Sequence, residues 1–154
     1  MSLYHLFEAM EATPIGAGIK GSVWLFPAIE AVHLLALAML GGAILMLDLR
    51  LLGLGLSAQS TSMVERATRP WLIGALVVMI ASGVLIGLSE ALKLYDKQAF
   101  WVKMIALAAA LLFTFAVKNP LARRDPGLIA KPLAAVSLSL WLTVAIAGRW
   151  IGFS

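Results

Sequence analysis

Residues 23–47 read VWLFPAIEAVHLLALAMLGGAILML, an apolar run in which Glu30 and His33 are the only ionisable side chains. A helix of about 20 residues crosses the hydrocarbon core of a bilayer, so this run is long enough to span one. The apolar residues are continuous and do not alternate with polar ones. The run therefore predicts a transmembrane helix and excludes a strand of a membrane barrel.

Three more apolar runs of spanning length follow, at residues 71–92, 100–117 and 133–153. We expect Pro70 and Pro132 to mark helix starts, because a proline costs little in the first turn of a helix, and Lys118-Asn119-Pro120 to end the third span. The expected fold is all-α. It is an integral membrane antiparallel four-helix bundle that forms a single membrane domain over residues 1–154.

The segment ahead of the first span, residues 3–12, has apolar residues at helical spacing. Leu3, Leu6, Phe7 and Met10 form this stripe, and the charged residues lie off it. Such a pattern is typical of a short amphipathic helix lying in the membrane interface. We expect this interfacial helix to precede the bundle.

Composition agrees with a membrane protein. The 154 residues are 62% hydrophobic and only 13% charged, with a mean hydropathy of +0.96, whereas soluble domains carry charge on roughly a quarter of their residues. The chain has no cysteine, which excludes disulfides, thiolate metal sites and cysteine nucleophiles. Its formal net charge is +4, but the basic residues are not gathered on one face, so no nucleic acid is expected as a partner.

The distribution of basic residues predicts the topology. One side of the predicted bundle carries Arg50, Arg66, Arg69, Lys118, Arg123, Arg124 and Lys131, and the other only Lys20, Lys93 and Lys97 outside the spans. Loops rich in Lys and Arg stay in the cytoplasm. The expected location is therefore the inner, cytoplasmic membrane of a bacterium, with both termini in the periplasm and the lipid bilayer as solvent.

Charged residues inside the spans are the candidate site. Helical rise places Glu30 roughly 10 Å and His33 roughly 15 Å below the outer surface, and a charge at such depth needs a partner or a function. Five residues fall in the same outer leaflet and form one predicted cluster: Glu30, His33, Glu90, Lys103 and Arg149. The cluster is interpreted either as a binding site or as internal salt bridges that fix the helices, with Lys103 and Arg149 reaching toward the interface.

His33 has several possible roles. An imidazole near the midplane can ligate a metal such as haem iron, carry protons, or donate a hydrogen bond to Glu30. A haem b on His33 needs a second axial ligand, for which the sequence offers Met79, an open position, or His33 of a second chain in a homodimer. Lys103 and Arg149 are then expected to pair with haem propionates or with a quinone headgroup.

Several stretches resemble a bacterial inner-membrane family of unknown function. They are the run from His33 to Gly53, Ser82-Gly83 through Ser89-Glu90-Ala91, Ala99 through Met104, and Gly148-Arg149-Trp150-Ile151-Gly152-Phe153. The resemblance implies a small four-helix fold, loosely similar to the copper-resistance D and b-type cytochrome membrane proteins. In those proteins a histidine on a helix can bind haem.

Two functions fit these observations. The first is a small redox-type subunit in electron transport that binds haem b or a quinone and works with other membrane or periplasmic redox subunits. The second is a non-catalytic structural or accessory subunit of a larger membrane complex. A proton-coupled transporter is disfavoured because the spans are few and no broken helix pair is visible. Catalytic motifs of soluble enzymes are missing, so no enzymatic activity of the chain alone is expected.

Overall fold

The computed structural model describes residues 3–153, and within them every regular element is a helix. Four helical stretches are long and apolar enough to cross a membrane, as the sequence predicts. They are α3 (Leu25–Leu52), α4 (Thr61–Ser89), the stretch Gln98–Arg123 and the stretch Gly127–Ile151. The third stretch consists of α6 (Gln98–Leu112), the π-helical turn η1 (Phe113–Lys118) and α7 (Asn119–Arg123); the fourth consists of the 3₁₀ turn η2 (Gly127–Ile129) and α8 (Ala130–Ile151).

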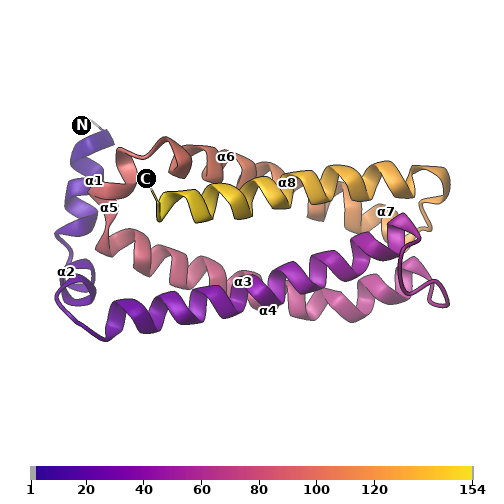
Figure 1. Ribbon diagram of the computed structural model, residues 1–154, viewed down its shortest axis with the longest axis horizontal. Coiled ribbons are helices and arrows are strands. Elements are labelled where there is room, and N and C mark those ends of the chain that lie inside the picture. The colour runs from indigo at the N-terminus through magenta and orange to yellow at the C-terminus, as the bar shows by residue number, and fades with distance from the viewer. Residues whose placement is uncertain (1–2, 154) are drawn as a thin grey trace.

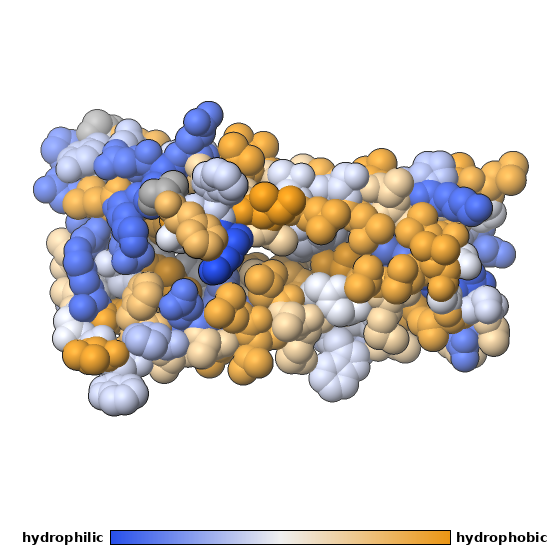
Figure 2. All heavy atoms as spheres, in the orientation of Figure 1, coloured by the Kyte–Doolittle hydropathy of each residue, from blue (hydrophilic) through white to orange (hydrophobic). Residues whose placement is uncertain are grey.

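The long helices form two antiparallel hairpins that lie side by side (Figure 1). One hairpin is α3 with α4, and the other is α6 through α7 with α8. Both chain termini lie at one end of the bundle, here called the terminal end, and the turns at residues 53–60 and 124–126 form the opposite, loop end. Figure 2 shows hydrophilic residues at both ends and hydrophobic residues over the long helices between them, which is the pattern of a membrane-spanning bundle.

The hydrophobic core divides along the length of the bundle. At the loop end one cluster joins α3, α4, α7 and α8 through residues that include Leu47, Val64, Ala122 and Ala134. Farther toward the termini each hairpin has its own cluster, one within α3 and α4 and the other within α6 and α8. Trp141 packs against both of these clusters. The hairpins therefore share a core at the loop end and are bridged by one indole beyond it.

Two helix boundaries differ from the sequence expectation. The helix α4 begins at Thr61, where the Ser60 side chain accepts the Met63 N–H at 3.2 Å, and Pro70 lies inside it and does not mark its start. The helical path also continues past Pro120 to Arg123. Pro120 has no N–H to donate to the carbonyl four residues before it, and the turn that precedes it is wound as the π-helix η1. The wider turn allows the helix to continue instead of stopping.

Three short helices close the terminal end: α1 (Leu3–Glu11), α2 (Pro14–Lys20) and α5 (Ala91–Tyr95). In Figure 1 α1 lies across this end of the bundle, and its bounds match the predicted N-terminal helix closely. Phe7, the buried residue of α1, has its ring centroid 5.2 Å from that of Tyr95 and 6.0 Å from that of Trp101. Aromatic packing therefore holds α1 against α5 and α6.

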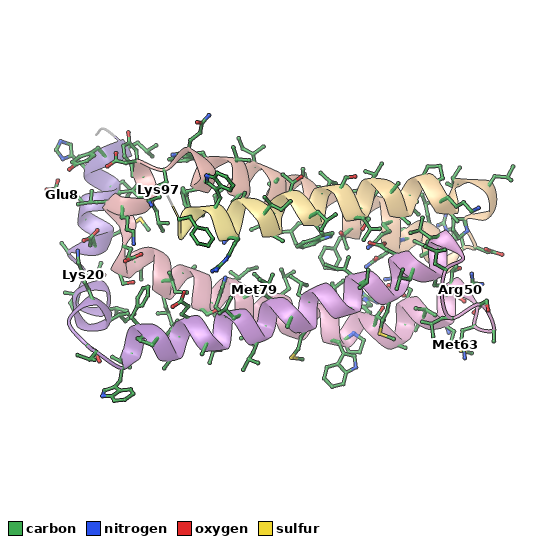
Figure 3. The ribbon with its side chains drawn as sticks, viewed as in Figure 1. Glu8, Lys20, Arg50, Met63, Met79 and Lys97 are labelled. Carbon is green, nitrogen blue, oxygen red and sulfur yellow. The ribbon has the colours of Figure 1, made fainter. Side chains whose placement is uncertain are left out.

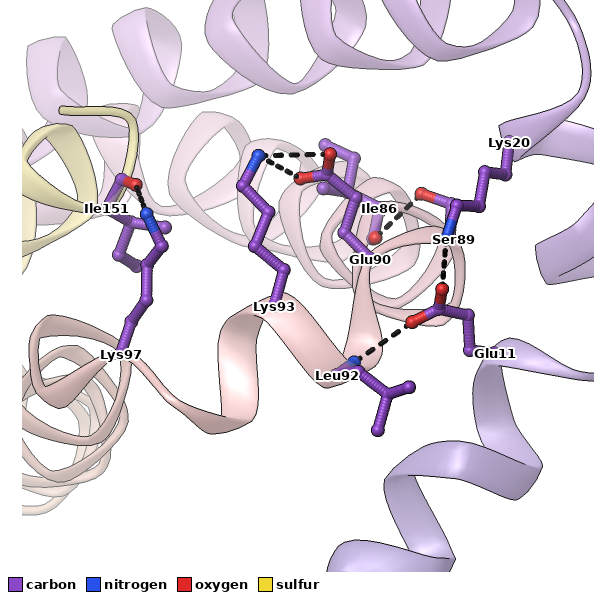
Figure 4. A network of polar contacts seen from close by, with 9 residues as sticks. All are labelled: Glu11, Lys20, Ile86, Ser89, Glu90, Leu92, Lys93, Lys97 and Ile151. Carbon is purple, nitrogen blue, oxygen red and sulfur yellow. Dashed lines mark hydrogen bonds and ion pairs between the residues drawn. The ribbon is translucent and has the colours of Figure 1, made fainter. Parts of the chain in front are cut away.

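A carboxylate adds a second attachment. Glu11 accepts the Leu92 N–H at 3.0 Å and is paired with the Lys20 ammonium group (Figure 4). The hydrogen bond from Lys20, followed by that from the Leu92 N–H, holds the pKa of Glu11 below its ordinary value of 4.5. The ionised form is therefore the one that ties α1 and α2 to the start of α5.

This attachment predicts that the docking of α1 on the bundle depends on pH. A carboxylate whose pKa is lowered in the folded state contributes its full stabilisation above its ordinary pKa and loses it as pH falls through the lower, folded value. A fluorophore on a cysteine introduced at the exposed Ala9 should therefore show anisotropy that is constant above pH 5 and drops at a midpoint below 4.5. In Glu11→Ala the anisotropy should be low at every pH, and in the control Glu8→Gln it should match the parent. An unchanged profile in Glu11→Ala would show that Glu11 does not hold α1.

Candidate functional site

His33 lies on α3 and is hydrogen-bonded to α4. Its Nδ1 is 2.8 Å from the Ser82 Oγ, and this hydroxyl donates in turn to the Val78 carbonyl at 2.6 Å. Since the Ser82 proton is used there, the hydroxyl accepts a proton from His33 Nδ1–H. Nε2 is then the ring nitrogen with a free lone pair, and it has no hydrogen-bond partner within residues 3–153.

Close packing fixes this ring against α4. A Cβ at Gly83 would lie only 3.3 Å from the His33 Cε1, so the glycine makes room for the imidazole. Glu30 is one of the hydrogen-bond partners predicted for His33, but the partner is Ser82, and Glu30 is exposed. Glu30 is one turn away on the same helix, while Ser82 faces the ring directly from the neighbouring helix.

Lys103 is a second ionisable residue within a span and belongs to the other hairpin. It lies on α6, is half-buried, and packs its side chain on α8, where a Cβ at Gly148 would be 3.4 Å from its Cε. The ammonium group itself makes no ion pair and no hydrogen bond with any residue that the structure describes. A cation within a span and without a protein partner is costly in a bilayer.

The remaining predicted site residues are placed apart from this pair. Glu90 contacts Lys93, with Lys93 Nζ 3.1 and 3.2 Å from its two oxygens (Figure 4). Arg149 is exposed and lies over the Phe153 ring, 4.5 Å from its centroid. Met79 is 8% exposed and belongs to the α3–α4 core cluster; it is labelled in Figure 3. The five-residue cluster is thus not one connected network, and no ion pair joins Glu30 to Arg149 among the described residues.

A second polar group, which sequence analysis did not identify, lies nearer the loop end. Lys118 Nζ donates to Asp48 Oδ1 at 3.0 Å and to Ser137 Oγ at 2.8 Å, and Ser137 Oγ donates to Asp48 Oδ2 at 2.7 Å. The side chains of Asp48 and Lys118 are 0% exposed, and Ser137 is also 0% exposed. These three residues, here called the buried triad, join α3, η1 and α8.

The π-helical turn places Lys118 inside the bundle. Thr114 and Lys118 are the two buried residues of η1, and Thr114 accepts the Trp141 indole N–H at 3.0 Å. The sequence analysis counted Lys118 among the loop cations because Pro120 was expected to end the helix. Asp48 directly follows the predicted first span, on the same side of the membrane as Lys118 at the end of the third, and this is the signal that could have paired them.

A further ion pair closes the loop end beside the buried triad. Arg123 Nη2 is 2.7 Å from Glu65 Oε1, and Thr61 donates to the Ala122 carbonyl at 2.9 Å. Glu65 is 1% exposed. These contacts attach α7 to the start of α4, so polar side chains from all four long stretches are bonded at this end.

The buried triad predicts that substitutions of Asp48 and Lys118 have strongly coupled effects on stability. Removing either Asp48 or Lys118 leaves the other as an uncompensated buried charge, which costs about 3–5 kcal/mol of folding free energy. Asp48→Leu and Lys118→Met should each lower the stability against detergent denaturation by about this amount, and the double variant should be less destabilised than their sum. The exposed residues Glu30 and Arg149 supply matched controls, since Glu30→Gln and Arg149→Gln should each change stability by no more than about 0.5 kcal/mol. Additive losses for Asp48 and Lys118 would contradict this interpretation.

The described residues contain no group of three or more His, Cys, Asp or Glu side chains that could hold a metal ion.

Comparison with known proteins extends these findings. Searches among curated proteins and among solved structures give no match. A family model described as a family of unknown function, DUF6644, matches residues 6–154, which is nearly the whole chain. This agrees with the resemblance to a family of unknown function noted in the sequence. The chain therefore belongs to the DUF6644 family.

Proposed function

We propose that the chain is a small redox-type subunit of a bacterial inner membrane that binds a quinone headgroup between its two hairpins. The observation that carries the proposal is that two ionisable residues of the spans, His33 and Lys103, form no ion pair within residues 3–153. Both lie within membrane spans, they come from different hairpins, and neither the His33 Nε2 nor the Lys103 ammonium has a protein partner within residues 3–153. A bound polar group would give both nitrogen atoms a hydrogen-bond partner.

The two residues offer complementary chemistry. With its Nδ1 proton held by Ser82, His33 presents Nε2 as a hydrogen-bond acceptor and as a base, while Lys103 presents three donors. A quinone headgroup dissolves in the bilayer and carries two oxygens on opposite sides of its ring, and it transfers electrons together with protons. On oxidation of the quinol, His33 would accept one of its two protons and water the other, while Lys103 would donate a hydrogen bond to the second oxygen. The electrons would pass to a one-electron carrier in a partner subunit.

Haem b is less well supported than a quinone. The hydrogen bond from Nδ1 to Ser82 would suit an axial ligand, but the other ligand named in the sequence analysis, Met79, fills the α3–α4 core. His33 also packs its ring directly against Gly83 of α4. A haem on His33 would need an open position or a second chain. The similarity to copper-resistance D and b-type cytochrome proteins stays a prediction.

The orientation is part of the proposal. With Lys118 buried, the loop end still has six basic residues, namely Arg50, Arg66, Arg69, Arg123, Arg124 and Lys131, against three lysines at the terminal end. The positive-inside bias then favours a cytoplasmic loop end and periplasmic termini. His33 and Lys103 would lie in the outer leaflet, within reach of a periplasmic or membrane-bound redox partner.

Binding of decylubiquinone to the purified protein tests the proposal. Quenching of tryptophan fluorescence should report saturable binding, with the reduced form bound more tightly because His33 Nε2 accepts its hydroxyl proton. His33→Gln should weaken binding of the reduced form by roughly 10-fold or more, the loss expected for a hydrogen bond to a charged or basic group. Lys103→Met should weaken the binding of both the reduced and the oxidised quinone.

Two controls distinguish quinone binding from haem binding and from an accessory function. Lys93→Met removes a lysine that pairs locally with Glu90, and its binding should equal that of the parent. An absorption spectrum of protein from haem-replete cells checks for a Soret band that disappears in His33→Ala. Such a band would show that the group bound at His33 is haem, and it would overturn the quinone proposal. Failure to bind either group would overturn the redox proposal and favour the accessory-subunit function, for which the rigid buried triad is the supporting observation.

A further inference from the structure

The loop end has a shallow groove with basic and apolar walls. One wall is the last turn of α3, with Arg50 and Leu52, and the other is the start of the α8 stretch, with Leu128 and Lys131. Leu128 is 100% exposed, so an apolar side chain stands free beside the two cations. The groove lies where the long apolar helices end, which is where the headgroup region of a bilayer begins.

Cations at the two ends of the bundle have different partners. At the terminal end Lys20 pairs with Glu11, Lys93 pairs with Glu90, and Lys97 donates to the Ile151 carbonyl at 3.1 Å. At the loop end Arg123 is paired with Glu65. The remaining basic residues of that end form no ion pair in the part of the chain that the structure describes; they are Arg50, Arg66, Arg69, Arg124 and Lys131. Two of these cations without an ion pair, Arg50 and Lys131, line the groove.

Arg50 is held in position for binding. Its Nε donates to the Gln59 carbonyl at 2.5 Å, which ties the guanidinium group to the turn between α3 and α4. The two terminal nitrogens remain available as donors, and an arginine so fixed can bind phosphate oxygens in a bidentate manner. Lys131 is exposed on the opposite wall and adds a second positive charge.

We propose that this groove binds the headgroup of an anionic phospholipid. The phosphate would lie between Arg50 and Lys131, and the acyl chains would run along Leu52 and Leu128 toward the apolar surface of the bundle. Basic residues at a membrane surface attract anionic lipids with about 1 kcal/mol each. A free phosphate would gain the charge contacts but not the apolar ones, so the lipid is the favoured occupant. This proposal does not depend on the function of His33.

Lipid titration in detergent tests whether the groove binds an anionic phospholipid. The probes are phosphatidylglycerol, phosphatidylcholine and inorganic phosphate, each added to the purified full-length protein and followed by native mass spectrometry. Phosphatidylglycerol should be retained in preference to phosphatidylcholine. Arg50→Gln and Lys131→Gln should each weaken its retention about fivefold, the change that corresponds to about 1 kcal/mol. The double variant should weaken retention about 25-fold if the two effects add.

Matched variants at the other end provide the control. Lys93→Gln and Lys97→Gln remove lysines from the terminal end and should leave retention of phosphatidylglycerol unchanged, as should His33→Gln. Equal retention of both lipids, or equal losses for the variants of the two ends, would overturn the proposal. Displacement of the lipid by millimolar inorganic phosphate would also overturn it, because the site would then recognise phosphate without the acyl chains. Circular dichroism of each variant confirms that the helices are intact.

Discussion

The buried ion pair between Asp48 and Lys118 is the constraint on which the arrangement of this bundle depends. Neither side chain is exposed to solvent or lipid, and Ser137 completes the hydrogen bonding of both. A buried charge without a partner is strongly unfavourable, so α3, η1 and α8 must keep the register that joins these three residues. The π-helical turn η1 follows from this requirement and from Pro120, since it carries Lys118 inward where the helix would otherwise be expected to stop.

The same constraint separates the molecule into two halves. At the loop end the buried triad, the Glu65–Arg123 pair and the shared hydrophobic cluster hold all four long stretches together. Toward the termini each hairpin has its own core, and Trp141 connects the two. His33 and Lys103 lie in this less tightly joined half, on different hairpins. The buried triad therefore does not fix the spacing of the hairpins around the proposed quinone site.

The sequence predicts most of the fold and part of the candidate site. Long apolar runs are sufficient to locate four spanning helices, because the bilayer requires them. Two helix boundaries predicted from Pro70 and Pro120 are wrong. The effects of these prolines depend on tertiary packing and on a π-helical turn that no local pattern indicates. Helical depth predicts that His33 and Lys103 lie in the same leaflet, but it cannot tell which residues face one another. Ser82 is for this reason missed as the partner of His33, and Lys118 is missed as the partner of Asp48.

Distances between spin labels test most directly whether the buried triad holds the hairpins together. The chain has no cysteine, so cysteine pairs can be introduced at exposed positions of α3 and α8, Leu45 with Val136 toward the loop end and Leu34 with Ile146 toward the termini. In reconstituted bilayers, electron paramagnetic resonance should give a narrow distance distribution for the loop-end pair that becomes broad in Asp48→Asn while helix content is retained. A loop-end distribution that stays narrow in Asp48→Asn would contradict the account.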